Sequence, residues 1–452
     1  MTKYLFLFLF LLLSISQIHA QSVSSQPDPV IKQMVEEVST QNLETIVRKL
    51  ASFETRHSLS STKSASKGIG AARNWVESEF KKYAQASNGR LQVIQDPFIL
   101  EPDGRRINRR VEMRNVMATL KGTNPNDTRV LIISGHLDSR NTDIMDSTGR
   151  APGANDDASG VAIVMELARV MSKKEFPCNI VFVAVQGEEQ GLLGAKHLAD
   201  RAKKENWNIT GMITNDIIGN SVSDETNLRD NTHVRVFSEG VPAYETEEMT
   251  KLRKSIFSEN DSQSRQFARY IKDVGEKYVG QMQVELIYRN DRFLRGGDHT
   301  PFSQNGFTAV RMTEMNENFQ QQHQNVRTEN GIQYGDLPEF VDYQYLNKNA
   351  GVNLATLASL ALAPSAPEQV GVVTSNLTNK TTLKWQASST GEKPAGYYVL
   401  MRETHSPVWT RKFFVSSTEA TLPYSKDNFL FAVQAIDAEG HESLPVIPVP
   451  VK

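Results

Sequence analysis

Apolar and polar positions follow two different patterns along the chain, and the change falls near residue 364. From about 30 to 360, short continuous apolar runs alternate with segments in which apolar residues have helical spacing. Such runs are typical of strands buried on both faces, and the helical spacing is typical of amphipathic helices. This alternation predicts an α/β fold with a mostly parallel central sheet flanked by helices. The expected strands are Val130–Ser134, Ile180–Val185, Gly211–Asn215, His233–Ser238, Gln283–Tyr288 and Thr308–Thr313, and the expected helices are 66–86, a segment around 161–168, Leu192–Lys204 and about 339–361.

A second unit is expected after a linker of small residues and prolines, ALAPSAP at 361–367. Apolar residues then alternate with polar ones, as at Leu383 and Trp385 and again at Phe429 and Phe431. Turn-rich segments separate these short runs, which is the pattern of a small all-β sandwich.

The N-terminus has the pattern of a signal peptide. Lys3 precedes an apolar run, Tyr4–Leu13, and a small residue, Ala20, stands where a signal peptidase cuts. The run is too short for a bilayer core, which needs about 20 apolar residues. We therefore expect a secreted or periplasmic protein with no membrane span, divided into a signal peptide (1–20), a main domain (21–363) and a C-terminal domain (364–452).

Composition excludes several classes of protein. The 452 residues are 39% hydrophobic and 23% charged, as in a soluble globular chain. Lys and Arg number 50 against 52 Asp and Glu, a net charge of −2, so the chain has no overall positive field to bind phosphate backbones. We expect no nucleic-acid partner. Cys178 is the only cysteine, which excludes an internal disulfide.

Clusters of histidine and acidic residues follow the expected strands. Ligand sites in open α/β sheets gather at the carboxyl ends of strands, so these clusters can converge although they are far apart in sequence. The clusters are SGHLD at 134–138, PGANDDASG at 152–160, QGEEQG at 186–191 and Asn215-Asp216.

The donor types favour a metal site. Nitrogen and carboxylate ligands without thiolate indicate zinc or a similar divalent ion. Several carboxylates exceed what one catalytic ion takes, but they suit two ions about 3.5–4 Å apart with one carboxylate bridging. Each cluster alone has a simpler interpretation: Asp156-Asp157 as a helix cap and Glu188-Glu189 as solvated charge. Their joint occurrence at successive strand ends favours the metal site.

These motifs resemble the dinuclear zinc aminopeptidases of the bacterial leucyl aminopeptidase type, which are related to glutamate carboxypeptidase and the transferrin receptor ectodomain. The resemblance covers about 40–360 and rests on H-x-D, GANDDASG and GEE-x-GLLG in this order. It implies two Zn²⁺ ions per chain. The implied roles are His136 and Asp216 on one zinc, Asp156 as the bridge, Glu189 on the second zinc, Glu188 as general base and Asp138 as the carboxylate that orients His136.

The fifth ligand is expected near the end of the domain. In the family, the last histidine lies some 25 residues beyond a D-H-x-x-F segment, commonly in a Tyr-His-Thr context. That segment is Asp298–Phe302 here, and His323 lies 25 residues beyond Asp298, although in a Gln-His-Gln context. We favour His323 over His299, and we expect Asp298 and His299 to lie near the site.

The resemblance implies a zinc exopeptidase that removes N-terminal residues from peptides, with Glu188 taking a proton from a water that bridges the metals. The expected signal peptide adds that the enzyme is secreted. Three alternatives remain: a carboxypeptidase or dipeptidase on the same metal core, a glutaminyl cyclase-like enzyme, and a non-catalytic receptor-like protein. The C-terminal region resembles a fibronectin type III domain, through Trp385 and the FAVQAIDAEGHES segment. Such domains act as spacers or contact surfaces or glycans, and we expect the spacer role.

Overall fold

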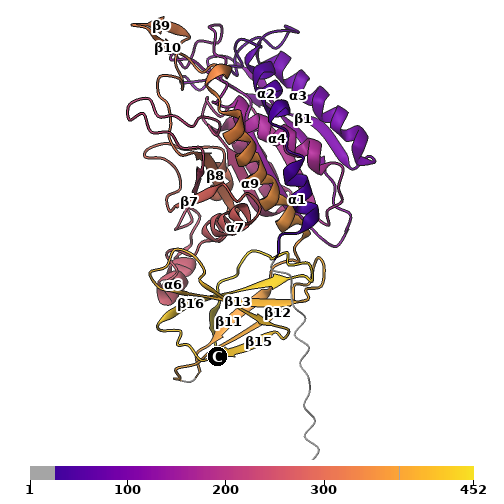
Figure 1. Cartoon of the computed structure of the whole chain (residues 1–452), viewed down its shortest axis with the longest axis vertical. Helices are drawn as coiled ribbons and strands as arrows, with labels where there is room; N and C mark the ends of the chain where they lie inside the picture. Colours follow the sequence, from indigo (N-terminus) through magenta and orange to yellow (C-terminus); the bar gives the residue numbers. More distant parts are fainter. Residues whose placement is uncertain (1–25, 376) are drawn as a thin grey trace, which may run out of the picture.

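A mixed sheet of eight strands forms the centre of the larger unit (Figure 1). The computed structural model describes residues 26–375 and 377–452, so the expected signal peptide lies outside the described residues. The strand order is β1-β2-β4-β3-β5-β8-β6-β7. The strands are β1 (Leu91–Leu100), β2 (Val111–Leu120), β3 (Arg129–His136), β4 (Asn179–Val185), β5 (Asn208–Asn215), β6 (His233–Phe237), β7 (Gln283–Ile287) and β8 (Ala309–Glu314).

The middle of this sheet is parallel. β3 pairs in parallel with β4 on one side and β5 on the other, and β8 continues the parallel set beside β5. The β1–β2 hairpin joins β4 antiparallel, and β6 and β7 run antiparallel to β8. The expected α/β fold with a mostly parallel sheet is confirmed.

Helices cover both faces of the sheet because its central strands bury alternate residues on opposite sides. Leu131 and Ile133 of β3 belong to the larger core cluster, whereas Val130 and Ile132 belong to a second one. Helices α4, α7 and α9 lie over the first cluster, and α5 and α8 lie over the second. The helices are α1 (Pro29–Glu36), α2 (Thr40–Ala51), α3 (Gly68–Ala84), α4 (Ala158–Met171), α5 (Leu193–Lys204), α6 (Glu247–Ile256), α7 (Gln263–Tyr278), α8 (His299–Gln304) and α9 (Tyr343–Leu362).

The C-terminal unit consists of a four-stranded and a three-stranded sheet. Leu383 and Trp385 from the first share a core with Val399 and Val433 from the second, so the two sheets pack face to face as the C-terminal sandwich. Its assignment as a fibronectin type III domain stays a prediction. The sheets are β15-β12-β11-β17 and β14-β13-β16, from β11 (Glu368–Val373), β12 (Thr381–Gln386), β13 (Gly396–Glu403), β14 (Arg411–Val415), β15 (Glu419–Leu422), β16 (Phe429–Ile436) and β17 (Val449–Val451).

The C-terminal sandwich lies at one end of the larger unit (Figure 1), and its contacts place it at the amino end of the central parallel strands. The guanidinium of Arg129, the first residue of β3, donates to the carbonyl of Ala363 at the end of α9. Just before β3, the carbonyl of Asn126 accepts from the N–H of Gly391. His136 is at the other end of β3, and a strand rises about 3.3 Å for each residue between Arg129 and His136. The sandwich is therefore remote from side chains at the carboxyl ends. Within the described ranges, no helix is long and apolar enough to cross a membrane.

Candidate metal centre

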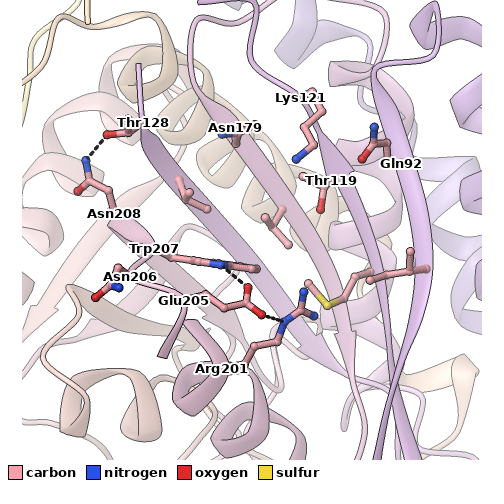
Figure 2. Close-up of a pocket in the computed structure, with 14 residues that line it drawn as sticks. Gln92, Thr119, Lys121, Thr128, Asn179, Arg201, Glu205, Asn206, Trp207 and Asn208 are labelled. Carbon is pink, nitrogen blue, oxygen red and sulfur yellow. Dashed lines mark hydrogen bonds and ion pairs between the residues drawn. The ribbon is translucent and has the colours of Figure 1, made fainter. Parts of the chain in front are cut away.

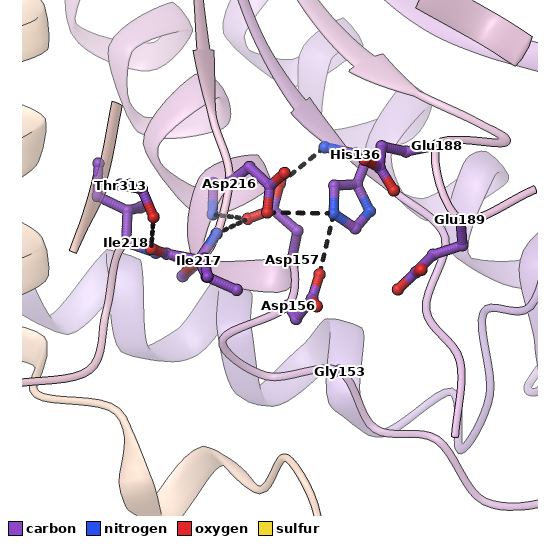
Figure 3. A network of polar contacts seen from close by, with 12 residues as sticks. His136, Gly153, Asp156, Asp157, Glu188, Glu189, Asp216, Ile217, Ile218 and Thr313 are labelled. Atoms are coloured by element: carbon purple, nitrogen blue, oxygen red, sulfur yellow. Dashed lines mark hydrogen bonds and ion pairs between the residues drawn. The ribbon is translucent and has the colours of Figure 1, made fainter. Parts of the chain in front are cut away.

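The carboxyl ends of three adjacent parallel strands supply the site (Figure 3). His136 is the last residue of β3, Asp216 directly follows β5, and Glu188 and Glu189 lie in the loop after β4. Asp156 is in the loop before α4, which packs on all three strands. The sequence clusters predicted at separate strand ends thus meet at one edge of the sheet.

Asp156 lies between the two histidines. Its Oδ1 is 3.0 Å from Nε2 of His136, and its Oδ2 is 2.9 Å from Nε2 of His323. His323 Nε2 is also 3.0 Å from Oε1 of Glu189, and His136 Nε2 is 3.7 Å from Oδ1 of Asp216. The five side chains predicted as ligands therefore form two neighbouring donor groups joined by one carboxylate.

His299 does not belong to either group. Its Nε2 lies 2.7 Å from the carbonyl oxygen of Asn290 and 3.6 Å from Oδ2 of Asp291. The geometry favours His323 over His299 as the fifth ligand, although His323 lies outside the sequence context typical of the family. Asp298 and His299 are both buried.

Asp157 lies close to His136 and Asp216 but is already saturated with hydrogen bonds. Its Oδ2 accepts the main-chain N–H of His136 at 2.8 Å. Its Oδ1 accepts those of Gly160 at 3.0 Å and Ile217 at 3.3 Å. Asp157 caps the N-terminus of α4 and binds main-chain groups at the ends of β3 and β5. These bonds occupy its carboxylate, so it is not part of the proposed ligand set, although one of its oxygens lies within 4.8 Å of donor atoms of His136 and Asp216.

Asp138 orients a different group from the one expected. Its carboxylate accepts main-chain N–H groups from Gly187 at 2.8 Å, Glu188 at 3.2 Å and Glu189 at 3.1 Å. Nδ1 of His136 lies 3.0 Å from the main-chain oxygen of Asp138 but 3.9 Å from its carboxylate. The carbonyl is thus the acceptor that fixes the imidazole, and the carboxylate fixes the loop with the two glutamates.

The pKa values in the cluster are shifted because many carboxylates are buried close together. Burial raises the pKa of Glu188 well above its ordinary value, and the negative charges of Asp216 and Glu189 add to the effect. Burial likewise raises the pKa of Asp298 to about 7. Burial alone would lower the pKa of His323, but Glu189 and Asp156 raise it to about 10. The cluster therefore holds more negative charge than its own cations offset.

Residues without a motif support the site. Asp336 accepts the main-chain N–H of Asp156 at 2.7 Å, and the amide of Gln322 donates to Asp156 Oδ2 at 3.1 Å. Arg56 is fully buried and donates to the carbonyls of Leu137 and Gly153, joining the two motif loops. Sequence reasoning missed Asp336 and Arg56 because both lie far from the motifs, and it treated Gln322 only as the neighbour of His323 because no spacing marks it as a partner of Asp156.

The cluster lines an open cavity of about 320 Å³, together with four arginines. A larger cavity of about 600 Å³ lies on the sheet face beside the end of α5 (Figure 2). Its charged groups include Arg201 and Glu205, which pair with each other at 2.9 Å, and Trp207 donates to Glu205. None of the predicted ligands or the general base lines this larger cavity.

The donor set fits divalent zinc. Imidazole nitrogen and carboxylate oxygen are ligands zinc accepts, and the contacts of Asp156 with both histidines suit two ions that share it. The fixed Nδ1 of His136, held by a carbonyl, leaves Nε2 facing the carboxylates, as ligating imidazoles require. Two dications would also offset the crowded negative charge.

Comparison with known sequences assigns the family. The model of "Peptidase family M28" matches residues 115–344. A probable zinc metalloprotease of Leptosphaeria maculans is 47% identical over 95% of this chain and 99% of its own length. A probable zinc metalloprotease of Pyrenophora tritici-repentis is 43% identical over 96% of this chain and 90% of its own.

Solved structures show the same fold at low sequence identity. The LapA aminopeptidase of Legionella pneumophila superposes with a TM-score of 0.52 at 17% identity, covering 79% of this chain and 80% of that one. An aminopeptidase from Aneurinibacillus sp. strain AM-1 gives 0.50 at 16% identity, covering 72% and 95%. With a family match over half of its length and a relative of nearly equal length, the chain belongs to peptidase family M28 and is a zinc metallopeptidase.

Proposed function

We propose that this metallopeptidase is a secreted exopeptidase with two zinc ions, and that it acts as an aminopeptidase on peptides. The observation that carries the proposal is the position of Asp156, with one oxygen 3.0 Å from His136 and the other 2.9 Å from His323. A carboxylate between two imidazoles is suited to bridge two ions. His136, Asp156 and Asp216 would hold one zinc, and Asp156, Glu189 and His323 the other.

Zinc, when bound, supplies Lewis-acid polarisation of the scissile carbonyl and a water of lowered pKa. Glu188 lines the same cavity, and no described side chain or main-chain group hydrogen-bonds its carboxylate. It is therefore free to accept a proton from the attacking water and return it to the leaving amine. Asp138 holds the main chain of Glu188 in place for both transfers.

A dipeptidase or carboxypeptidase on the same metal core is the second candidate. It is favoured by the four arginines that line the cavity, because a guanidinium binds a free carboxylate rather than an ammonium. Hydrolysis of leucine p-nitroanilide supports the aminopeptidase, whereas activity confined to N-blocked peptides with a free C-terminus supports the second candidate.

The test of the general base is Glu188→Gln, which keeps size and shape but cannot take a proton. We expect zinc content to be retained and kcat to fall by about 10²–10⁴-fold, the usual contribution of a general base. The matched control is Glu248→Gln, an exposed residue on α6. A Glu188→Gln variant with near wild-type kcat contradicts the role. N-terminal sequencing of protein from the culture medium tests secretion, and the expected first residue is Gln21.

A further inference from the structure

The metal cavity has a surplus of guanidinium groups on its rim. Its lining includes Arg106, Arg140, Arg292 and Arg295. Arg292 and Arg295 pair with the same carboxylate, Glu317, at 3.1 and 3.0 Å. Arg235, which is not in the lining, pairs with Glu317 as well, at 3.0 Å. Three guanidinium groups thus share one carboxylate.

A second nearby carboxylate does not remove the surplus. Asp291 lies 3.3 Å from Nε of Arg292 but is also 3.4 Å from the buried Arg311. Burial lowers the pKa of Arg292, and the neighbouring positive charge of Arg311 adds to the effect. Arg311 further pairs with Asp216 at 3.1 Å. Because Asp216 is a proposed zinc ligand, its charge is not free to neutralise this group.

The opposite rim has the same character. Arg106 donates to the main-chain oxygen of Glu189 at 2.7 Å, and no carboxylate in the described chain pairs with it. Arg140 pairs with the Glu189 carboxylate at 3.1 Å and contacts Nδ1 of His323 at 2.6 Å. Both partners of Arg140 are proposed zinc ligands. If Glu189 and His323 bind zinc, the negative charge of Glu189 is neutralised by the metal. Arg140 can then pair with a carboxylate of the substrate.

Guanidinium groups in a cavity recognise carboxylates through paired, charge-assisted hydrogen bonds. Arg295 is better placed to do so than Arg292, because its side chain remains 34% exposed whereas that of Arg292 is 8% exposed. It lies between Leu294, whose side chain is exposed, and Gly296, and both of these residues line the cavity. Basic substrates would be repelled from the same position.

We propose that the cavity selects peptides that carry a carboxylate beside the scissile bond, with Arg295 and Arg106 as specificity-determining residues. This inference rests on the proposed peptidase function. The carboxylate has two sources, an acidic side chain at the N-terminal residue or the free C-terminus of a dipeptide. Both present the same group at the cavity rim, so the substrates in the test separate them.

The test uses two pairs of substrates that differ only in charge. The first pair is α-glutamyl and glutaminyl p-nitroanilide, and the second is Leu-Gly and Leu-Gly amide. For the zinc-loaded full chain, we expect kcat/KM for the carboxylate member of at least one pair to be about tenfold higher or more, the scale of one charge-assisted hydrogen bond. Preference in the first pair identifies the side chain, and preference in the second identifies the C-terminus.

The variants assign the preference to the rim. Arg295→Gln is expected to lower the carboxylate-to-amide ratio about tenfold, mainly through KM. Arg106→Gln tests the other rim independently in case the first variant does not fold. Arg105→Gln is the control, since Arg105 is exposed, adjacent in sequence and absent from the cavity lining. Its ratio should match the wild type.

Failure of this inference differs from failure of the proposed function. An active enzyme with ratios of one or less in both pairs overturns the inference and leaves the peptidase intact. If the zinc-loaded chain hydrolyses no substrate, the proposed exopeptidase is wrong. Calorimetric binding of Leu-Gly and of its amide to the zinc-loaded Glu188→Gln variant then decides the inference: tighter binding of the free acid supports it, and equal binding overturns it.

Discussion

Asp138→Asn separates two roles for a buried carboxylate beside the metal centre. Oδ1 accepts from Gly187 and Glu188, and Oδ2 accepts from Glu189 at 3.1 Å. Asparagine keeps only one of the two acceptor oxygens. Its NH₂ group then faces the main-chain N–H that the other oxygen accepted, and this hydrogen bond is lost. The lost charge-assisted hydrogen bond corresponds to about 1.5–3 kcal/mol. If this loss appears fully in the transition state, kcat falls about 10- to 100-fold.

Fold and zinc content are expected to survive this change. Burial raises the pKa of Asp138, so its ionised form is costly and a neutral amide removes that cost. The main-chain oxygen that lies 3.0 Å from His136 Nδ1 is unaffected by the substitution. The ligand should therefore keep its orientation, and only the loop with Glu188 should lose its anchor.

The assay is steady-state kinetics on leucine p-nitroanilide, with zinc measured by mass spectrometry on the same samples. Asp143→Asn is the control, because Asp143 is exposed and lies in the same loop after β3 as Asp138. A kcat within twofold of the wild type refutes the anchoring role. Loss of zinc with recovery of kcat in excess zinc refutes it too, because it would show that the carboxylate acts on His136.

Three further perturbations follow from the same structure. Asp261→Ala removes a buried carboxylate that lies 2.9 Å from both Arg269 of α7 and Arg402 of the C-terminal sandwich. The free energy of unfolding should fall by about 3–5 kcal/mol, and calorimetric unfolding should split into two transitions. One unchanged transition contradicts this. Burial raises the pKa of Glu239 to about 7, so ionisation destabilises the fold as pH rises from about 4.5 to 7. In urea unfolding at pH 8, Glu239→Gln should recover roughly 1–2 kcal/mol of the free energy of unfolding, and below pH 4 it should change nothing. If the free energy of unfolding varies with pH equally in both proteins, the assignment is wrong. Chelation of zinc should lower Tm and its return should restore Tm, because the ions bind only the folded cluster; an unchanged Tm in the chelated protein contradicts the fit.

Burial decides which parts of the fold could be predicted. β3 and β4 were predicted because they are covered on both faces and appear as continuous apolar runs. The β1–β2 hairpin was not, because β1 alternates buried and exposed residues irregularly at the sheet edge. His323 was predicted from its distance along the chain beyond Asp298, although its neighbours differ from the family's usual ones. The structure places its Nε2 2.9 Å from Oδ2 of Asp156.

The site was predictable as a set of side chains but not as a network of contacts. The three motifs identified His136, Asp156 and Glu189 from local sequence, and the family resemblance implied Asp216 and His323. Asp336 and Arg56 reach the site through tertiary structure alone. For Asp138 the residue was predicted, but its main-chain oxygen lies nearer to His136 Nδ1 than its carboxylate does, at 3.0 Å against 3.9 Å. A side chain and a main-chain carbonyl of one residue can satisfy different neighbours, and sequence spacing does not distinguish them.

The most direct test of the central claim is anomalous diffraction at the zinc edge from crystals of the zinc-loaded full chain. Two zinc ions that share Asp156 should give two peaks about 3.5–4 Å apart, one beside each oxygen of this carboxylate. A single peak, or two peaks that do not share that carboxylate, contradicts the claim.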